Sequence, residues 1–204
     1  ITNSYNLIDG IDGLAGGLGT LASLFFGVFF LMNNDYQMVI LSFTLSGSII
    51  AFLFYNFNPA RIFMGDTGSL VIGLILSVLA IRLINTGVTV PDVGRYVNKG
   101  PFIVISILAV PLYDTFRVFC IRLLSGYNPL RPDRNHIHHA LLDLGFGHRK
   151  ASIILYVFSL LIMFLSYFMI DMSLGLSIFL LSIIVLGCMA IPFVVLQIRS
   201  RDES

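Results

Sequence analysis

Long apolar runs separated by short polar segments are the dominant pattern of the 204-residue chain. A helix needs about 20 apolar residues to cross the hydrocarbon core of a bilayer. Six runs approach that length: residues 14–32, 38–55, 69–84, 101–120, 152–170 and 174–197. None of them alternates with the period of two that a lipid-facing barrel strand shows. The pattern therefore predicts an all-α fold, a polytopic transmembrane helix bundle with six spans, in which residues 1–204 form a single membrane-embedded domain.

The composition supports a membrane location. Soluble domains contain about 25% charged residues, whereas this chain has 11% charged and 57% hydrophobic residues. We therefore expect the lipid bilayer as a partner, and the formal net charge of +1 gives no reason to expect nucleic acid. Cys120 and Cys188 both lie in apolar runs, where they are expected as small buried hydrophobes rather than as a disulfide. The sequence opens with Ile1 directly before a polar motif, which we interpret as the start of an N-terminally truncated fragment.

Basic residues are distributed unequally between the two sides of the predicted bundle. Six crossings place both ends on one side, together with the segments 56–68 and 121–151. Of the 12 Lys and Arg residues, only Arg82, Arg95 and Lys99 lie on the other side. Cytoplasmic loops carry an excess of Lys and Arg, so the pattern predicts that both ends and the polar motifs are cytoplasmic. On the outer side, residues 33–37 and 171–173 are expected as tight turns and residues 85–100 as a larger loop.

The first polar motif is NSYNLIDGIDGLAGG near the start of the chain. Asp9 and Asp12 are three residues apart, so on a helix they would share one face, and Asn6 precedes Asp9 by the same interval. A stripe of amide and carboxylate groups suits a sugar, a nucleoside or a hydrated metal ion. Gly13 and Gly17 form a small-xxx-small pair, for which a helix-packing seam is the plainer interpretation.

The second polar motif is FNPARIFMGDTGSL, directly before the third predicted span. Gly65 and Gly68 permit backbone conformations that are closed to other residues, and Thr67 or Ser69 is a candidate cap for the following helix. Free backbone N–H groups at such a helix start favour a phosphate. Asp66 beside them could hold Mg²⁺, which takes one or two carboxylates plus substrate phosphates. The alternative is that Asp66 merely caps the span.

The third polar motif, NPLRPDRNHIHHALLDLGFGHRK, lies between the fourth and fifth predicted spans. Its candidate substrate-binding residues are Arg131, Arg134, His136, His138 and His139. The guanidinium fork suits phosphate, and neutral histidines suit phosphate or sugar oxygens. A zinc site is disfavoured because no cysteine is near and the histidine spacing is unusual for zinc, whereas a solvated juxtamembrane face stays an alternative. Asn135 is expected to cap a short helix that runs to Leu144 and ends at Gly145.

A further charged pair lies inside the fourth predicted span. Asp114 and Arg117 are three residues apart, so an ion pair between them is expected. Two interpretations remain open at this point: the pair holds helices together, or Asp114 lines the same polar cavity as a substrate-binding residue.

Taken together, the segments NLIDGIDGLAGG, FMGDTGSL and RPDRNHIHHALLDLGF resemble the polyprenyl-phosphate N-acetylhexosamine-1-phosphate transferases of glycosyltransferase family 4, in particular the undecaprenyl-phosphate GlcNAc-1-phosphate transferase type. The resemblance implies a multi-pass enzyme of the bacterial inner membrane with a cytoplasmic active site. It also implies transfer of a sugar-1-phosphate from a UDP-N-acetylhexosamine to undecaprenyl phosphate, with release of UMP and a requirement for Mg²⁺, for which Mn²⁺ is a second candidate. The family's additional spans and its upstream motif of paired aspartates are not found in these residues.

The same resemblance implies residue roles. Asp66 resembles the metal ligand of the family, and Phe63 resembles a residue that stacks on the uracil ring. Asn6, Asp9 and Asp12 match positions that line the nucleotide pocket, and the third motif matches the loop that recognises the sugar and the diphosphate. We therefore take Asp66, Asp9 and Asp12 as the candidate catalytic residues.

Three other functions compete with this interpretation. The phospho-N-acetylmuramoyl-pentapeptide transferases share the first two motifs but carry a different histidine cluster, so HIHHALL favours UDP-N-acetylglucosamine or a close isomer as the donor. A transporter would need ionisable residues near the middle of the bilayer, whereas the acids here gather at one rim. A non-catalytic scaffold for envelope assembly is the third alternative. A second copy of the chain is a candidate partner that the sequence leaves open.

Overall fold

The structure is a computed structural model that describes all residues except 87, 91–94, 98, 127–134 and 203–204. The described residues form helices and one pair of short strands: α1 (Thr2–Ile8), α2 (Leu14–Met32), α3 (Tyr36–Asn56), α4 (Gly65–Thr86), β1 (Val88–Val90), β2 (Arg95–Val97), α5 (Gly100–Ile107), α6 (Ala109–Leu124), α7 (Ile137–Asp143), α8 (His148–Phe168) and α9 (Leu174–Asp202).

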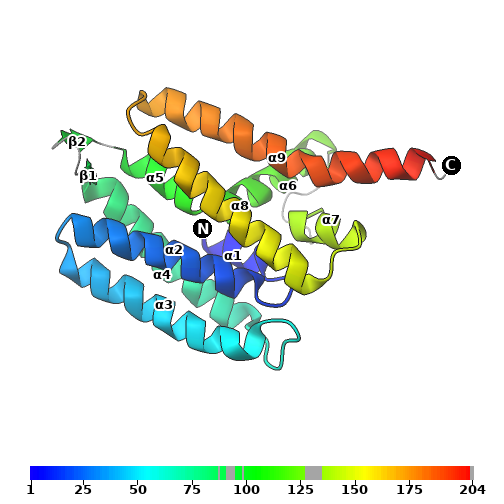
Figure 1. The fold of residues 1–204 in the computed structure, drawn as a ribbon, viewed down its shortest axis with the longest axis horizontal. Coiled ribbons are helices and arrows are strands. Elements are labelled where there is room, and N and C mark those ends of the chain that lie inside the picture. Colours follow the sequence, from blue (N-terminus) through cyan, green and yellow to red (C-terminus); the bar gives the residue numbers. More distant parts are fainter. Residues whose placement is uncertain (87, 91–94, 98, 127–134, 203–204) are drawn as a thin grey trace.

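The long helices lie side by side with alternating directions, so their ends gather at the two ends of an elongated bundle (Figure 1). Helix α2 contacts α3, α4 and α8 and is the central element. One end of the bundle holds the α3–α4 link, α7 and the C-terminus, on the right in Figure 1. The other end holds the α2–α3 and α8–α9 turns and the two strands.

The helices confirm a polytopic membrane bundle. Five of the described helices are long and apolar enough to cross a bilayer, and the number of spans is six if the bent pair α5–α6 is counted as one. Helix α2 has the predicted bounds of Leu14–Met32, whereas α4 begins at Gly65 rather than at Ser69. The predicted outer loop 85–100 contains the antiparallel pair β1–β2, in which Val88 is the register partner of Val97.

The segment predicted as a span over residues 101–120 is not one straight helix in the structure. Helices α5 and α6 meet at an angle of 84°, with Leu108 at the break (φ −100°, ψ 19°). Pro111 explains the break, because it has no N–H to donate to the carbonyl of Ile107 and its ring clashes with that position.

Side-chain packing distinguishes the core from the lipid-facing surface. Phe26 and Phe30 of α2 are fully buried, whereas Phe54 of α3 and Phe164 of α8 are widely exposed. Apolar side chains that face outward are expected where the surroundings are lipid tails. Both cysteines are free, as the sequence predicted, but the expectation that they are buried is wrong: Cys120 is partly exposed and Cys188 is exposed on the apolar outer surface of the helices.

The Gly13/Gly17 pair is an internal packing seam. The ring of Tyr156 on α8 lies where a side chain at Gly17 would point, and a Cβ there would lie 2.0 Å from the ring. The hydroxyl of Tyr156 also donates to the carbonyl of Gly13. The small residues thus let α2 and α8 of the same chain approach each other closely.

Charged side chains also connect helices at the end of the bundle that holds the two strands. Arg82 Nε of α4 lies 2.7 Å from Asp35 Oδ2 in the α2–α3 turn. Lys99 is buried before α5, and its ammonium group donates to the carbonyl of Met172 in the α8–α9 turn.

Candidate active site

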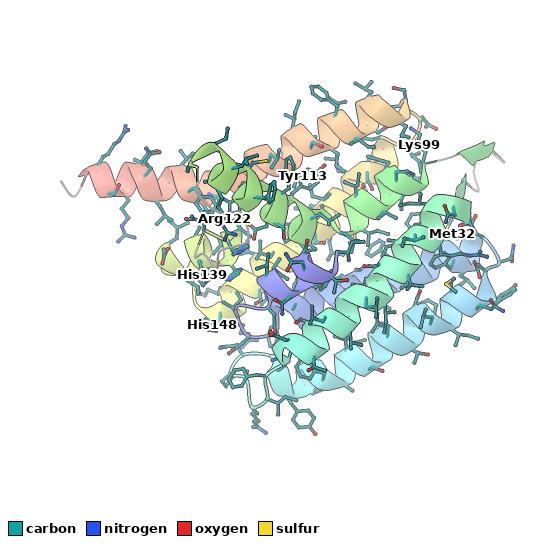
Figure 2. The ribbon with its side chains drawn as sticks, turned by 180° about the vertical axis from the view of Figure 1, so that it is seen from behind. Met32, Lys99, Tyr113, Arg122, His139 and His148 are labelled. Carbon is teal, nitrogen blue, oxygen red and sulfur yellow. The ribbon has the colours of Figure 1, made fainter. Side chains whose placement is uncertain are left out.

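The three polar motifs meet at one end of the bundle, and the Arg82–Asp35 and Lys99–Met172 contacts lie at the other end. Figure 2 shows the separation directly: His139 and His148 lie at one end, and Lys99 and Met32 lie at the other. The site is built from the link between α1 and α2, the link between α3 and α4, and the segment around α7.

Helix α1 brings the first motif to the second. Asn6 Nδ2 donates to Asp66 Oδ1 at 3.0 Å and to Ser69 Oγ at 3.1 Å. The close approach depends on Gly73 of α4, because a Cβ there would lie 2.6 Å from the Cα of Thr2. Thr2 is therefore level with a part of α4 about two turns from Asp66, so the first residues lie along the inside of the bundle rather than at the rim.

Asp9 follows α1 directly and is half-buried. Burial, together with the nearby charge of Asp66, raises its pKa to about 6. Two nearby carboxylates repel each other because both are negative, and this arrangement favours a bound cation.

The residues present fit a magnesium ion better than a closed zinc site. Among the described residues, no group of three or more His, Cys, Asp and Glu side chains could hold a metal ion by itself. Mg²⁺ is usually bound by one or two carboxylates together with substrate phosphates. Asp66, with Asp9 nearby, offers that smaller donor set.

The start of α4 differs in detail from the prediction. Gly65 has φ +63°, and Asp66 lies in the first turn of the helix rather than before it. Ser69, a predicted cap, lies inside the helix, where its hydroxyl donates back to the carbonyl of Gly65 at 3.2 Å. Phe63, just before this start, is 81% exposed at the rim.

Asp12 does not share a helix face with Asp9, because α1 ends at Ile8 and α2 begins only at Leu14. Its Oδ2 instead accepts hydrogen bonds from Asn58 Nδ2 at 2.8 Å and from the backbone N–H of Ala60 at 3.2 Å. His148 Nδ1 lies 3.5 Å from its Oδ1. Burial acts to raise the pKa of Asp12, but these hydrogen bonds and His148 outweigh it, so the pKa falls below its ordinary value.

The histidine segment is fixed to helix α6 through Asp114. Asp114 Oδ2 lies 2.8 Å from His136 Nδ1, and Oδ1 accepts the backbone N–H of Ile137 at 3.0 Å. The expected ion pair with Arg117 is present at 3.0 Å.

The ends of α7 agree only in part with the prediction. Asn135 was predicted as the cap of α7, but the N-cap position is held by His136. Gly145, at φ +93°, follows the end of the helix as expected. The candidates Arg131 and Arg134 lie outside the described residues.

His138 connects this segment to the first polar motif, which contains Asp9, Gly10 and Asp12. It is 1% exposed, and its ring lies so close to Gly10 that a Cβ there would be 2.2 Å from Nε2. Its ring stacks on His136 at 5.8 Å between centroids and lies 4.2 Å from that of His139. Burial, followed by the other histidines, lowers the pKa of His138 to about 3, so this imidazole is neutral.

Three residues in this region were missed in the sequence. Asn56 joins two loops, because its Oδ1 accepts the N–H of Gly13 at 3.1 Å and its Nδ2 donates to the carbonyl of Ile62 at 2.9 Å. Asn58 and His148 hold Asp12, as described above. Their position in the sequence could have indicated them. Polar residues directly before or after an apolar span are well placed to form hydrogen bonds between the segments that link the helices.

Comparisons with known proteins agree with these motifs. Residues 1–84 match the model of glycosyl transferase family 4. The chain is 36% identical over 186 residues to a probable undecaprenyl-phosphate N-acetylglucosaminyl 1-phosphate transferase of Bacillus subtilis, which covers 91% of this chain and 50% of that protein. It is 36% identical over 170 residues to the decaprenyl-phosphate N-acetylglucosaminephosphotransferase of Mycolicibacterium smegmatis, covering 77% and 41%. It is 32% identical over 157 residues to the undecaprenyl-phosphate alpha-N-acetylglucosaminyl 1-phosphate transferase of Escherichia coli, covering 75% and 41%. The chain thus spans about half or less of the length of these relatives.

Proposed function

Because the chain belongs to glycosyl transferase family 4, we propose that the complete protein transfers N-acetylglucosamine-1-phosphate, or the phosphate of a close isomer, from a UDP-sugar to undecaprenyl phosphate. The reaction releases UMP and begins a lipid-linked glycan of the cell envelope. Bacterial relatives that carry this activity in their names support the proposal.

One observation carries the proposal at the level of structure. Residues from three separate motifs converge at one rim of a membrane bundle: Asn6 bonds to Asp66 at 3.0 Å, and His138 lies against Gly10. A lipid phosphate and a nucleotide sugar can meet at such a rim, because the rim borders both hydrocarbon and water.

The proposed reaction is a direct displacement. An oxygen of the lipid phosphate attacks the β-phosphorus of the UDP-sugar, the bond from that phosphorus to the bridging oxygen breaks, and its electron pair leaves with UMP. The protein contributes mainly by positioning the reactants and balancing their charge. Asn6 holds Asp66 in place, Phe63 is available to stack on the uracil ring, and the histidine segment faces the acidic motif through His138.

A magnesium ion belongs to the proposal. Asp66 would hold it, with Asp9 nearby. A bound Mg²⁺ would offset the repulsion between the anionic lipid phosphate and the anionic diphosphate. Mn²⁺ is expected to substitute because it also accepts carboxylate and phosphate oxygens.

We place the site on the cytoplasmic side of the bacterial inner membrane. The rim with the three motifs carries most of the basic residues, whereas Arg82 and Lys99 lie at the opposite end. The positive-inside rule supports this orientation.

A transport function has little support in the described part of the chain. The acids of the first two motifs lie at one rim, and Asp114 is buried with protein partners at both oxygens. A transporter would need accessible ionisable residues near the middle of the bilayer.

One assay tests the proposed function. The full-length protein is incubated with Mg²⁺, undecaprenyl phosphate and labelled UDP-N-acetylglucosamine, and both labelled lipid and UMP are measured. UDP-N-acetylmuramoyl-pentapeptide in place of the donor tests the related transferase, and a chelator tests the metal requirement. Absence of both products with every N-acetylhexosamine donor would overturn the proposal.

Asp66→Asn is the matched variant for this assay. It keeps the size of the side chain and removes the charge that would hold the cation, so turnover is expected to fall by at least about 100-fold, as for removal of one key electrostatic group, while membrane insertion is unchanged. Asp171→Asn, an exposed acid in the α8–α9 turn at the opposite end of the bundle, is the control. Mg²⁺-dependent UMP release at the wild-type rate by Asp66→Asn would remove Asp66 from the chemistry.

A further inference from the structure

A buried aspartate on α6 fixes the hydrogen-bonding state of the first histidine of the third motif. Asp114 is 1% exposed, and an ionised carboxylate can only accept hydrogen bonds. Its three partners are the backbone N–H of Ile137, the guanidinium of Arg117 and Nδ1 of His136, at 3.0, 3.0 and 2.8 Å. The hydrogen of the His136 ring therefore lies on Nδ1.

The same cluster favours a neutral ring. Arg117 already balances the charge of Asp114, so a neutral His136 leaves the group without net charge. His136 is 3% exposed, and His138 stacks on it with an interplanar angle of 7°. A second buried cation at this position would have to overcome a desolvation cost without a carboxylate of its own.

The other ring nitrogen is then a bare acceptor. Nε2 of His136 is buried and has no hydrogen-bond partner among the described residues. Buried polar atoms nearly always have a partner in folded proteins. A lone pair can pair only with a donor, such as a hydroxyl or an amide N–H, and an ionised phosphate oxygen supplies neither. This nitrogen thus requires a hydrogen-bond donor as its partner, which a sugar hydroxyl or amide supplies and an ionised phosphate oxygen does not.

We propose that Asp114 is a positioning residue that holds His136 with a bare Nε2, and that this nitrogen accepts a hydrogen bond from a hydroxyl or amide N–H of the transferred sugar. The inference rests on the proposed function, which supplies an N-acetylhexosamine as substrate. The inference assigns His136 to recognition of the sugar, and the diphosphate is then bound by other residues.

Asp114→Asn tests the inference. The amide keeps an oxygen for Ile137 and Arg117, but its N–H₂ group facing His136 donates to Nδ1 and moves the ring hydrogen to Nε2. The loss of one accepted hydrogen bond is expected to raise KM for UDP-N-acetylglucosamine by on the order of 10-fold. Inhibition by UDP, which has the diphosphate without the sugar, should be unchanged. Weaker inhibition by UDP in the same proportion would overturn the inference.

A double-mutant cycle separates positioning from general loss of structure. In a His136→Ala background Asp114→Asn should have no further effect on KM, because no imidazole is left to orient. Additive effects would overturn the inference. If Asp114→Asn does not insert into the membrane, His136→Gln serves as the test variant instead. The introduced amide oxygen can accept the hydrogen bond in place of Nε2, so KM should stay closer to wild type than in His136→Ala. Equal KM values in wild type and His136→Ala would also overturn the inference.

A readout that does not depend on activity distinguishes failure here from failure of the proposed function. Solid-state ¹⁵N spectra of the full-length protein in lipid, with labelled histidine, should show Nδ1 of His136 protonated and Nε2 bare, and the reverse in Asp114→Asn. The His136→Gln sample assigns the signals. A wild-type protein that is inactive with UDP-sugars sinks the proposed function, whereas an active one with a protonated Nε2 sinks only this inference.

Discussion

Gly10 is the position where a single methyl group should interfere most directly with the site. In Gly10→Ala the added Cβ would lie 2.2 Å from Nε2 of His138, whereas ordinary van der Waals contact begins at 3.4 Å. The imidazole therefore has to retreat by about 1.2 Å, which would disturb its ring contacts with His136 and His139. Overpacking of this kind costs roughly 1–3 kcal/mol of stability.

The effect on catalysis should be larger than the effect on stability. A misplacement of about 1 Å can cost on the order of 100-fold in rate, so we expect kcat/KM for the UDP-sugar to fall by that amount. Turnover and thermal melting in detergent are measured side by side on the full-length protein. Gly47→Ala on α3 is the matched control, because a Cβ at Gly47 has nothing within 4 Å.

The double variant Gly10→Ala/His138→Ala checks the cause. Removal of the imidazole makes room for the methyl group, so the melting temperature lost in Gly10→Ala should largely return, whereas activity should not. Wild-type kcat/KM in Gly10→Ala would refute the reasoning, since the position of His138 against the acidic motif would then be irrelevant to turnover.

Two further predictions concern stability. The pKa of Asp9 is raised from 3.8 to about 6 in the folded protein, so folding binds a proton between these values, and the Asp9 contribution to the free energy of unfolding falls as pH rises from about 4 to 6. Asp9→Asn should flatten this part of the pH dependence of melting in metal-free buffer, and an unchanged slope would show that Asp9 is not the group involved. Lys99→Met keeps the length of the side chain but leaves the carbonyl of Met172 without its donor, which should cost about 1–3 kcal/mol. The exposed Lys150→Met is its control in thermal melting, and equal melting temperatures would contradict the role of Lys99.

The spans were predictable because the bilayer imposes both a length and a composition on any helix that crosses it. The bounds of α2 follow from the apolar run alone. The break between α5 and α6 also had a visible cause in Pro111, but a proline inside an apolar run bends a helix by an angle that depends on its neighbours.

The candidate site was predictable in its residue types but not in their partners. Asp9 and Asp12 have helical spacing, yet the chain leaves the helix after Ile8. Asp12 then accepts hydrogen bonds from the α3–α4 link, whereas Asp9 lies near Asp66. The contact between His138 and Gly10 joins segments that are far apart in sequence. Only the packing of α6, α7 and α8 around the first motif creates that contact, and no local propensity encodes it.

The bend at Leu108 also has a consequence for the surrounding lipid. Helix α5 has 8 residues, which is about 12 Å of rise, less than half of the roughly 30 Å of hydrocarbon in a bilayer. Beyond the bend, α6 shows the apolar side chains of Phe116, Phe119 and Leu123 on its outer surface and buries Asp114 on the inner one. Most of α5 is itself buried against neighbouring helices. In this part of the bundle the lipid tails therefore meet the outward side of α6 and not a full-length straight span.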